Sequence, residues 1–156
     1  MTSMLVRFLA IVLTAVALIP SGAHLLEMPN KMSLPVDRYF VVQQIYAGWA
    51  WWGIVQVAAF SAVVTLAVNL RDDPRRFRLA VLGAASILIF FAVFFTWTWP
   101  ANQATVNWTQ PHPDWEQLRR SWEVSHAVNA VILLLGLGAV VAAALEPVRR
   151  RRSEAP

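Results

Sequence analysis

The chain has 156 residues, of which 58% are hydrophobic and 14% are charged, and its mean hydropathy is +0.51. A soluble domain of this length is less apolar, so the composition predicts an integral membrane protein. The absence of cysteine excludes a disulfide framework, a thiolate metal site and a cysteine nucleophile. The net charge of +4 does not indicate a nucleic-acid partner, because the basic residues flank apolar segments and no nucleic-acid-binding motif accompanies them.

Four apolar segments predict four transmembrane helices. Each is long enough to cross a hydrocarbon core of about 30 Å at about 1.5 Å per residue. Because lipid cannot satisfy free backbone groups, segments of this length must be helical, and short connections join them into a bundle. We therefore expect an all-α, single membrane domain over residues 1–156, with helices at about 4–26, 40–70, 77–99 and 115–145 and a basic tail over 146–156.

The first segment ends in "SGAHLLE", which places His24 and Glu27 one helical turn apart. His24 lies 19 residues after Leu5, a rise of about 28 Å, so His24 should lie near the far hydrocarbon boundary. A cleaved signal peptide is the alternative, since Arg7 precedes the apolar run and small residues follow Pro20. The run is longer than a usual signal sequence, which favours a helix of the bundle.

In the second segment, Trp49, Trp52 and Gln56 share one helical stripe and could line one wall of a cavity, with plain core packing as the alternative. The third segment is followed by the longest connection, which is rich in Asn, Thr, Gln and Pro and predicts a cap over the outer end of the bundle. Asp114 and Gln117 have the spacing of a capping box, so the fourth helix should begin there.

The fourth segment opens with "SWEVSH", in which Glu123 and His126 are again one turn apart. His126 lies 19 residues before Leu145, which gives it the depth of His24 if the first and fourth helices are antiparallel neighbours. Glu27 and Glu123 would then form a second layer further out. A stripe with helical spacing runs along this segment through Arg119, Trp122, His126, Asn129 and Leu133.

The distribution of charge predicts the orientation in the membrane. Four basic residues lie on one side, namely Lys31, Arg38, Arg119 and Arg120. Nine lie on the other, namely Arg7, Arg71, Arg75, Arg76, Arg78 and the arginines at 149–152. The positive-inside rule therefore places both termini in the cytoplasm, as expected for a bacterial inner (plasma) membrane protein.

The outer half of this arrangement contains all eight tryptophans and all three histidines. An interfacial aromatic belt would explain some of them, but a belt is expected at both membrane faces, so an aromatic-lined pocket is the competing interpretation. Three interpretations of the His and Glu layers stay open. The side chains are satisfied locally, a histidine accepts a proton from a bound organic molecule, or the layers bind a metal through His24, Glu27, Glu123 and His126.

The segment 102–126, "NQATVNWTQPHPDWEQLRRSWEVSH", resembles the anthrone oxygenase-like family of small four-helix membrane proteins. The early "SGAHLLEMPNKM" is similar to the end of that family's first helix. Members often carry Arg where this chain has Asn129. The positions that carry the resemblance are Asn107, Trp108, Asp114, Trp115, Leu118, Arg119, Trp122 and His126.

The resemblance implies oxidation of a polycyclic phenolic anthrone by O₂ without a known organic cofactor. The chain would then be an oxidoreductase acting on a hydrophobic aromatic or quinone-like molecule taken from the lipid bilayer. His126 and His24 would take a proton, and Asn107 and Arg119 would stabilise oxyanion charge. Substrate contacts would come from Trp49, Trp52, Gln56, Trp108, Trp122 and Asn129.

The non-enzymatic alternative is an accessory subunit or a ligand- or metal-binding protein of a membrane complex. Small residues in "GLGAVVAAA" would suit packing against a partner helix or a second copy. No motif in the sequence requires a cofactor, and a metal is the one inorganic group that the His and Glu layers suggest.

Overall fold

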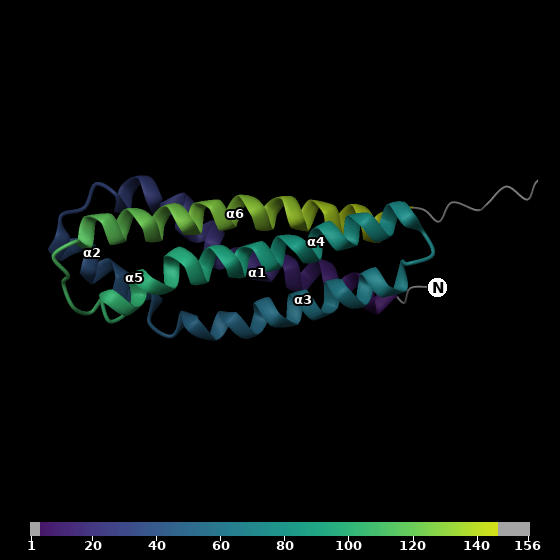
Figure 1. Ribbon diagram of the computed structural model, residues 1–156, viewed down its shortest axis with the longest axis horizontal. Helices are drawn as coiled ribbons and strands as arrows, with labels where there is room; N and C mark the ends of the chain where they lie inside the picture. The colour runs from purple at the N-terminus through teal and green to yellow at the C-terminus, as the bar shows by residue number, and fades with distance from the viewer. Residues whose placement is uncertain (1–3, 147–156) are drawn as a thin grey trace, which may run out of the picture.

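The computed structural model describes residues 4–146, and all regular structure in that range is helical. The elements are α1 (Met4–Lys31), α2 (Val36–Gln43), η1 (Gln44–Tyr46), η2 (Trp49–Trp51), α3 (Trp52–Asn69), α4 (Pro74–Val93), the π-helical η3 (Phe94–Thr98), α5 (Trp99–Ala104) and α6 (Trp115–Leu145). Figure 1 shows them as one elongated bundle. The predicted all-α fold is confirmed.

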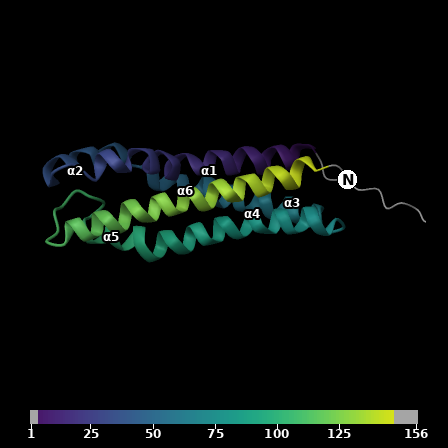
Figure 2. The ribbon, with the colours of Figure 1, turned by 90° about the horizontal axis from the view of Figure 1, so that it is seen from above.

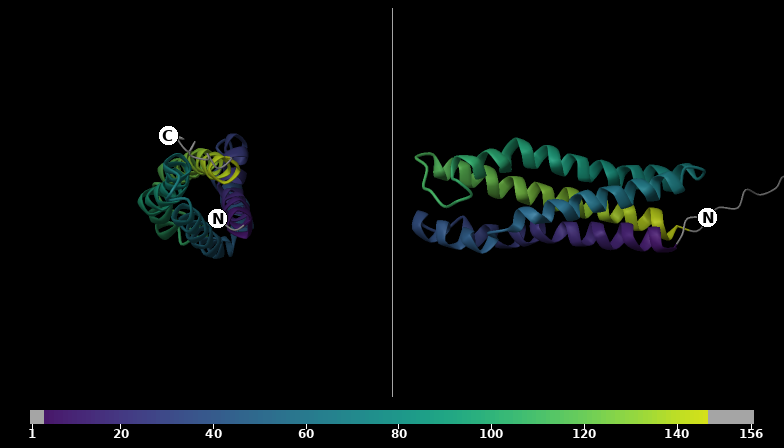
Figure 3. Two further views of the ribbon diagram at one scale, coloured as in Figure 1. Left: turned by 90° about the vertical axis from the view of Figure 1, so that its right-hand side faces the viewer. Right: turned by 90° about the horizontal axis from the view of Figure 1, so that it is seen from below.

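Four stretches are long and apolar enough to cross a membrane: Met4–Lys31, Trp49–Asn69, Pro74–Ala104 and Trp115–Leu145. They lie side by side around a common axis, as the end-on view of Figure 3 shows. α6 packs against α1 and α4, and α3 completes the bundle by packing against the same two helices. The predicted neighbourhood of the first and fourth helices is therefore confirmed.

The two ends of the bundle differ in their elements. Figure 2 shows that α1 begins and α6 ends at one end, while α2 and α5 lie at the other. We call the first the basic end, because Arg7, Arg75, Arg76 and Arg78 lie there on α1 and α4. The opposite end is the outer end, a name that follows the predicted orientation.

Small residues bring α4 and α6 close together in the half of the bundle nearer the basic end. A Cβ at Gly136 would overlap Ser86, and one at Gly83 would overlap the side chain of Val140. Ala59, Val63, Leu66 and other buried aliphatic residues fill the rest of this core. Close approach through small residues is the usual packing of membrane helices, because lipid provides no hydrophobic drive for association.

At the basic end, two arginines donate hydrogen bonds to carbonyl groups in the last turn of α6. Arg76 Nε donates to the carbonyl of Ala143 at 3.0 Å, and Arg7 Nη1 donates to the carbonyl of Ala144 at 3.2 Å. These carbonyls lie in the last turn of a helix and have no partner within it, so a cation is favourable there. α4 begins where Asp73 accepts a hydrogen bond from the amide of Arg76 and Pro74 occupies the first turn.

The helix boundaries differ from the sequence prediction in three places. α1 continues to Lys31 instead of ending near residue 26. The predicted helix over 40–70 is interrupted around Gly48, whose φ of +84° lies in the left-handed region that glycine adopts without a Cβ clash. The third span passes through the π-helical turn just before Pro100, which has no amide hydrogen to donate, and ends at Ala104.

The fourth helix begins at Trp115, as predicted, but the predicted capping box is wrong. The Asp114 side chain makes no capping hydrogen bond, and its backbone amide instead donates to His112 Nδ1 at 3.1 Å. The arginines at 149–152, which the prediction of the orientation uses, lie outside the described residues.

Candidate functional site

His24 on α1 and His126 on α6 face each other inside the bundle. Their ring centroids are 4.3 Å apart, and the side chains are 3% and 8% exposed. The indole of Trp122 lies within 4.7 Å of both rings, and Tyr46 and Trp49 pack against His24 at 4.4 and 5.7 Å. The prediction that both histidines lie at the same depth is confirmed. The counts from Leu5 along α1 and from Leu145 back along α6 both start at the basic end, and they lead to two residues in contact.

Both imidazoles have a buried nitrogen without a hydrogen-bond partner. Nδ1 of His24 and Nδ1 of His126 make no hydrogen bond to any other described residue. The nearest carboxylate to His24 is Glu27, with Oε2 at 3.9 Å from Nδ1, which is beyond hydrogen-bonding distance. Buried polar atoms are nearly always paired, so the two unpaired nitrogens at one contact make the histidine pair the candidate position for a ligand or water.

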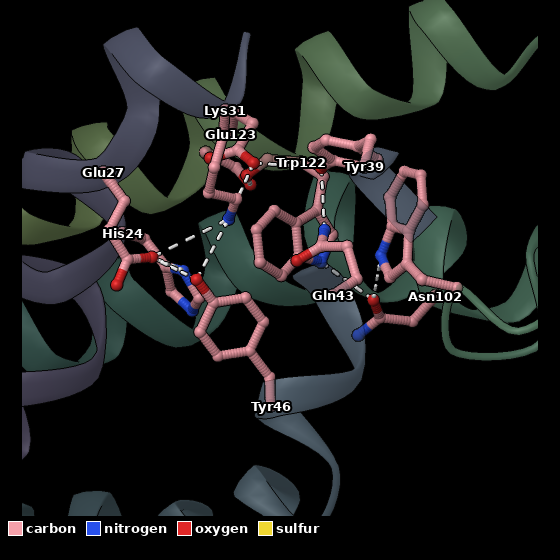
Figure 4. Close-up of polar contacts among 11 residues, drawn as sticks. His24, Glu27, Lys31, Tyr39, Gln43, Tyr46, Asn102, Trp122 and Glu123 are labelled. Atoms are coloured by element: carbon pink, nitrogen blue, oxygen red, sulfur yellow. Dashed lines mark hydrogen bonds and ion pairs between the residues drawn. The ribbon is translucent and has the colours of Figure 1, made fainter. Parts of the chain in front are cut away.

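Lys31 lies between the two carboxylates, Glu27 and Glu123, in the layer closer to the outer end than the histidines, as Figure 4 shows. Its Nζ lies 2.8 Å from Glu123 Oε1, 3.3 Å from the hydroxyl of Tyr46 and 4.0 Å from Glu27 Oε2. The ammonium also lies 4.7 Å from the ring centroids of both Tyr46 and Trp122. Lys31 is 3% exposed and Glu123 is fully buried, so this is a buried ion pair within an aromatic cage.

Two tyrosines complete the network from the segment between the first and second spans. Tyr39 donates to Glu123 Oε1 at 2.9 Å and accepts from Gln43 Nε2 at 2.7 Å, and Tyr46 donates to Glu27 Oε2. Burial, and next Glu123, raises the pKa of Tyr39 well above its usual value. Burial and the hydrogen bond to Glu27 likewise raise the pKa of Tyr46. Both hydroxyls therefore stay protonated and act as donors to the carboxylates.

Asn102 on α5 holds the aromatic residues of the cap. Its Oδ1 accepts from the indole nitrogens of Trp122 at 2.8 Å and Trp108 at 3.1 Å. Trp108 is 3% exposed and packs edge-to-face on Tyr39 and Trp122. The predicted cap is therefore an ordered structure in which Trp108 points into the bundle.

A left-handed turn directs Trp108 inward. Val106, Asn107 and Trp108 have φ values of 49°, 54° and 62°, although none is glycine. Such a conformation costs about 1–2 kcal/mol per L-residue. The turn leaves the Asn107 side chain exposed. The acceptor beside the tryptophans is Asn102, and the oxyanion role expected of Asn107 stays a prediction.

Arg119 contacts the segment between α1 and α2 and the first residue of α6 instead of the histidine pair. Its Nη1 donates to the carbonyl of Leu34 at 2.9 Å, and its guanidinium lies 4.6 Å from the ring centroid of Trp115 and 5.4 Å from that of Tyr39. The cation beside the histidine pair is Lys31, which the sequence prediction missed. Lys31 lies four residues after Glu27 and seven after His24, a stripe that becomes visible once α1 is extended past residue 26.

Gln56 and Asn129 connect helices. Gln56 Nε2 donates to the carbonyl of Ala17 at 2.8 Å, and Asn129 Nδ2 donates to the carbonyl of Phe90 at 3.3 Å. Each leaves its side-chain oxygen buried without a partner among the described residues. Trp52 is half-buried and makes no ring contact with either histidine in the described range.

The His and Glu layers do not form a metal site. No group of three or more metal-binding side chains within residues 4–146 is arranged to hold an ion. Glu123 is engaged by Lys31 and Tyr39, and Glu27 is hydrogen-bonded to Tyr46, so the carboxylates face an ammonium and hydroxyls.

Comparison with protein-family models, curated proteins and solved structures gives no match for this chain.

Proposed function

We propose that this membrane protein binds a hydrophobic aromatic molecule with a phenolic or quinone-type oxygen in its outer half and exchanges a proton with it. The observation that carries the proposal is the pair of buried, unpaired imidazole nitrogens on His24 and His126 within a cage of aromatic rings. Ionisable groups inside a membrane bundle are costly and usually functional.

The surrounding residues give each part of such a ligand a partner. An imidazole nitrogen accepts the phenolic or carbon-bound proton. The rings of Trp122, Tyr46 and Trp49 provide the faces against which a flat molecule packs. Lys31 takes the role expected of Arg119, since its ammonium lies 4.7 Å from the ring of Trp122, which contacts both histidines, and can stabilise an oxyanion.

In the enzymatic form of the proposal, which rests on the family resemblance, the chain is an oxidoreductase. Histidine removes a proton from the CH₂ group of an anthrone, and the resulting carbanion reacts with O₂. The net change converts CH₂ and O₂ into C=O and H₂O, so the methylene carbon is oxidised and O₂ is the oxidant. No protein-bound cofactor is needed for this balance.

The test is ligand binding and O₂ consumption by the purified full chain in lipid nanodiscs. Anthrone is the probe, and anthracene is its matched control because it has the same ring system without oxygen. Quenching of tryptophan fluorescence reports binding. We expect anthrone to bind more tightly than anthracene, and His126→Gln and His24→Gln to weaken anthrone binding about tenfold, the equivalent of one lost hydrogen bond.

His112→Gln is the matched control, because His112 lies in the cap and is partly exposed. Equal effects of the His112 and His126 substitutions would contradict the proposal, as would equal binding of anthrone and anthracene. Binding without O₂ consumption by the unmodified chain would leave a binding protein and exclude the oxygenase form for this substrate.

The proposed orientation, with both termini cytoplasmic in a bacterial inner membrane, has its own test. Since the chain has no cysteine, single cysteines at Ser33 and Gln110 can be labelled against a clean background. Both positions are exposed, at the outer end. Labelling from the periplasmic side is expected for both, whereas a cysteine at Asp72 should be labelled only after the membrane is opened. The reverse pattern would invert the orientation.

A further inference from the structure

A hollow of about 490 Å³ lies at the basic end, far from the histidine pair. It is formed where the first turns of α4 meet the last turn of α6. Its lining residues are Pro74, Arg75, Arg78, Leu79, Ala142 and Glu146. None of these residues has a role in the proposed aromatic site, so the hollow requires a separate explanation.

The hollow is positively charged at its mouth. Arg78 is exposed and has no ion pair or side-chain hydrogen bond with any described residue. Arg75 is paired through Nε with Glu146 Oε1 at 2.9 Å. Arg76 contacts Ala143, next to the wall of the hollow, and its Nη2 is buried without a partner in the described range. Guanidinium groups with unused donors favour a ligand with phosphate oxygens.

The wall below the arginines is apolar and continues onto the lipid-facing surface. Leu79 and Ala142 line the hollow. One to two helical turns deeper, Leu82 and Leu135 are 59% and 70% exposed on the faces that helical spacing aligns with Leu79 and Ala142. Charge at the mouth and apolar surface along the span match a molecule with an anionic head and a hydrocarbon chain.

We propose that this hollow binds the headgroup of an anionic phospholipid. The phosphate lies between Arg78 and Arg75, and an acyl chain lies along Leu79, Ala142 and Leu82. Free phosphate would leave the apolar wall uncovered, which is why a lipid is the better occupant. Glu146 competes with the phosphate for Arg75, so the bound phosphate must displace or share the ion pair between Arg75 and Glu146. This inference does not depend on the proposed aromatic site.

Native mass spectrometry of the full chain in detergent tests the inference by titration with phosphatidylglycerol and, separately, with phosphatidylcholine of the same acyl chains. We expect tighter binding of phosphatidylglycerol. Arg78→Gln should weaken it about fivefold, the factor that corresponds to about 1 kcal/mol per arginine near an anionic lipid. Glu146→Gln should strengthen it, because the competing carboxylate is removed.

Arg120→Gln is the matched control, since Arg120 is an exposed arginine at the outer end of the bundle. It should leave phosphatidylglycerol binding unchanged. The inference is overturned if Arg78→Gln has no more effect than Arg120→Gln, if both lipids bind equally, or if millimolar inorganic phosphate displaces phosphatidylglycerol. Because Arg78→Gln and Arg120→Gln change the net charge equally, a larger effect of Arg78→Gln would support a defined site over a general effect of net charge.

Discussion

The two halves of the bundle are held together by different interactions, close apolar packing in one and hydrogen bonds and an ion pair in the other. Towards the basic end, the core is aliphatic, and α4 and α6 approach through Gly83, Gly136 and Ser86. In the outer half, the helices surround His24, Lys31, Glu123 and His126, with aromatic rings between them. Close packing stabilises the first half, whereas the second depends on each polar group having its partner.

The outer half is therefore costly to build. A buried ion pair repays the loss of hydration only with good geometry and further hydrogen bonds, and apolar residues of the same volume often give equal or greater stability. A bundle selected for stability alone would have continued the aliphatic core outward. The difference leads us to expect that the outer polar layer contributes less to stability than an aliphatic core of the same volume would.

Glu123→Leu should have the largest effect on stability, because it removes the carboxylate that neutralises Lys31. We expect a loss of about 3–5 kcal/mol in the free energy of unfolding, measured by denaturant titration in detergent micelles. The double variant Lys31→Met with Glu123→Leu should recover most of that loss. Losses that simply add in the double variant would show that the pair contributes no coupling and would weaken the contrast between the two halves.

Asn102→Leu tests the cap of the outer half. It leaves the buried indole N–H groups of Trp108 and Trp122 without an acceptor, at about 1–3 kcal/mol for each unsatisfied group, so a loss of about 2–6 kcal/mol is expected. A red shift of tryptophan emission should accompany it. Asn102→Asp keeps the acceptor oxygen and should be much milder; equal losses would mean that the amide donors, and not the shared oxygen, matter.

Gly136→Ala tests the packing of the other half. The added methyl group would overlap Ser86, so we expect a loss of about 1–3 kcal/mol in thermal or denaturant unfolding. Gly138→Ala, two residues along the same helix, meets open space and should be nearly neutral or slightly stabilising. Tolerance of both substitutions would show that the α4–α6 contact is looser than the structure has it.

The smallest predicted effect is a pH dependence confined to the outer half. Burial raises the pKa of Tyr39, so above about pH 10 the unfolded chain releases a proton that the folded chain keeps. The stability that depends on this proton is complete below about pH 10 and falls as pH rises further, by at most about 1.4 kcal/mol per pH unit.

The measurement is the free energy of unfolding between about pH 9 and pH 11, compared with Tyr39→Phe. The variant should lose a constant amount at neutral pH, from the missing bond to Glu123, and should show a shallower decline above about pH 10. Tyr46→Phe is the matched comparison and should also make the decline shallower, because burial and the hydrogen bond to Glu27 raise the pKa of Tyr46 as well. An unchanged slope in Tyr39→Phe would contradict the assignment.

The sequence was sufficient for features that depend on length and period. Apolar runs predicted the four spans, and counting residues from the basic end placed His24 and His126 at one level. Helix rise is nearly constant, so depth can be counted before any contact is known. Trp122, His126 and Asn129 are all buried because their spacing of three and four residues places them on one face of the helix.

Contacts that depend on loop conformation could not be predicted. The left-handed turn over residues 106–108 exposes Asn107, and nothing in the local pattern distinguishes it from Asn102. The break at Gly48 sets the positions of Tyr46 and Trp49 against His24, whereas the sequence is equally compatible with a continuous helix. Lys31 had no role in the predicted site, because the end of α1 was placed near residue 26 and the stripe from His24 through Glu27 to Lys31 was cut short.

The spans have unequal lengths, and this ties the molecule to the thickness of its membrane. The Trp49–Asn69 span has 21 residues and matches a hydrocarbon core of about 30 Å, whereas the spans beside it have 28 and 31 residues and are longer than that by about 10–15 Å. We expect the surplus length of α1 and α6 to place Lys31 and Glu123 beyond the hydrocarbon edge, in the headgroup region. A thicker bilayer would cover this pair with acyl chains, so hydrophobic mismatch would act on the charged layer before it acts on the aliphatic core.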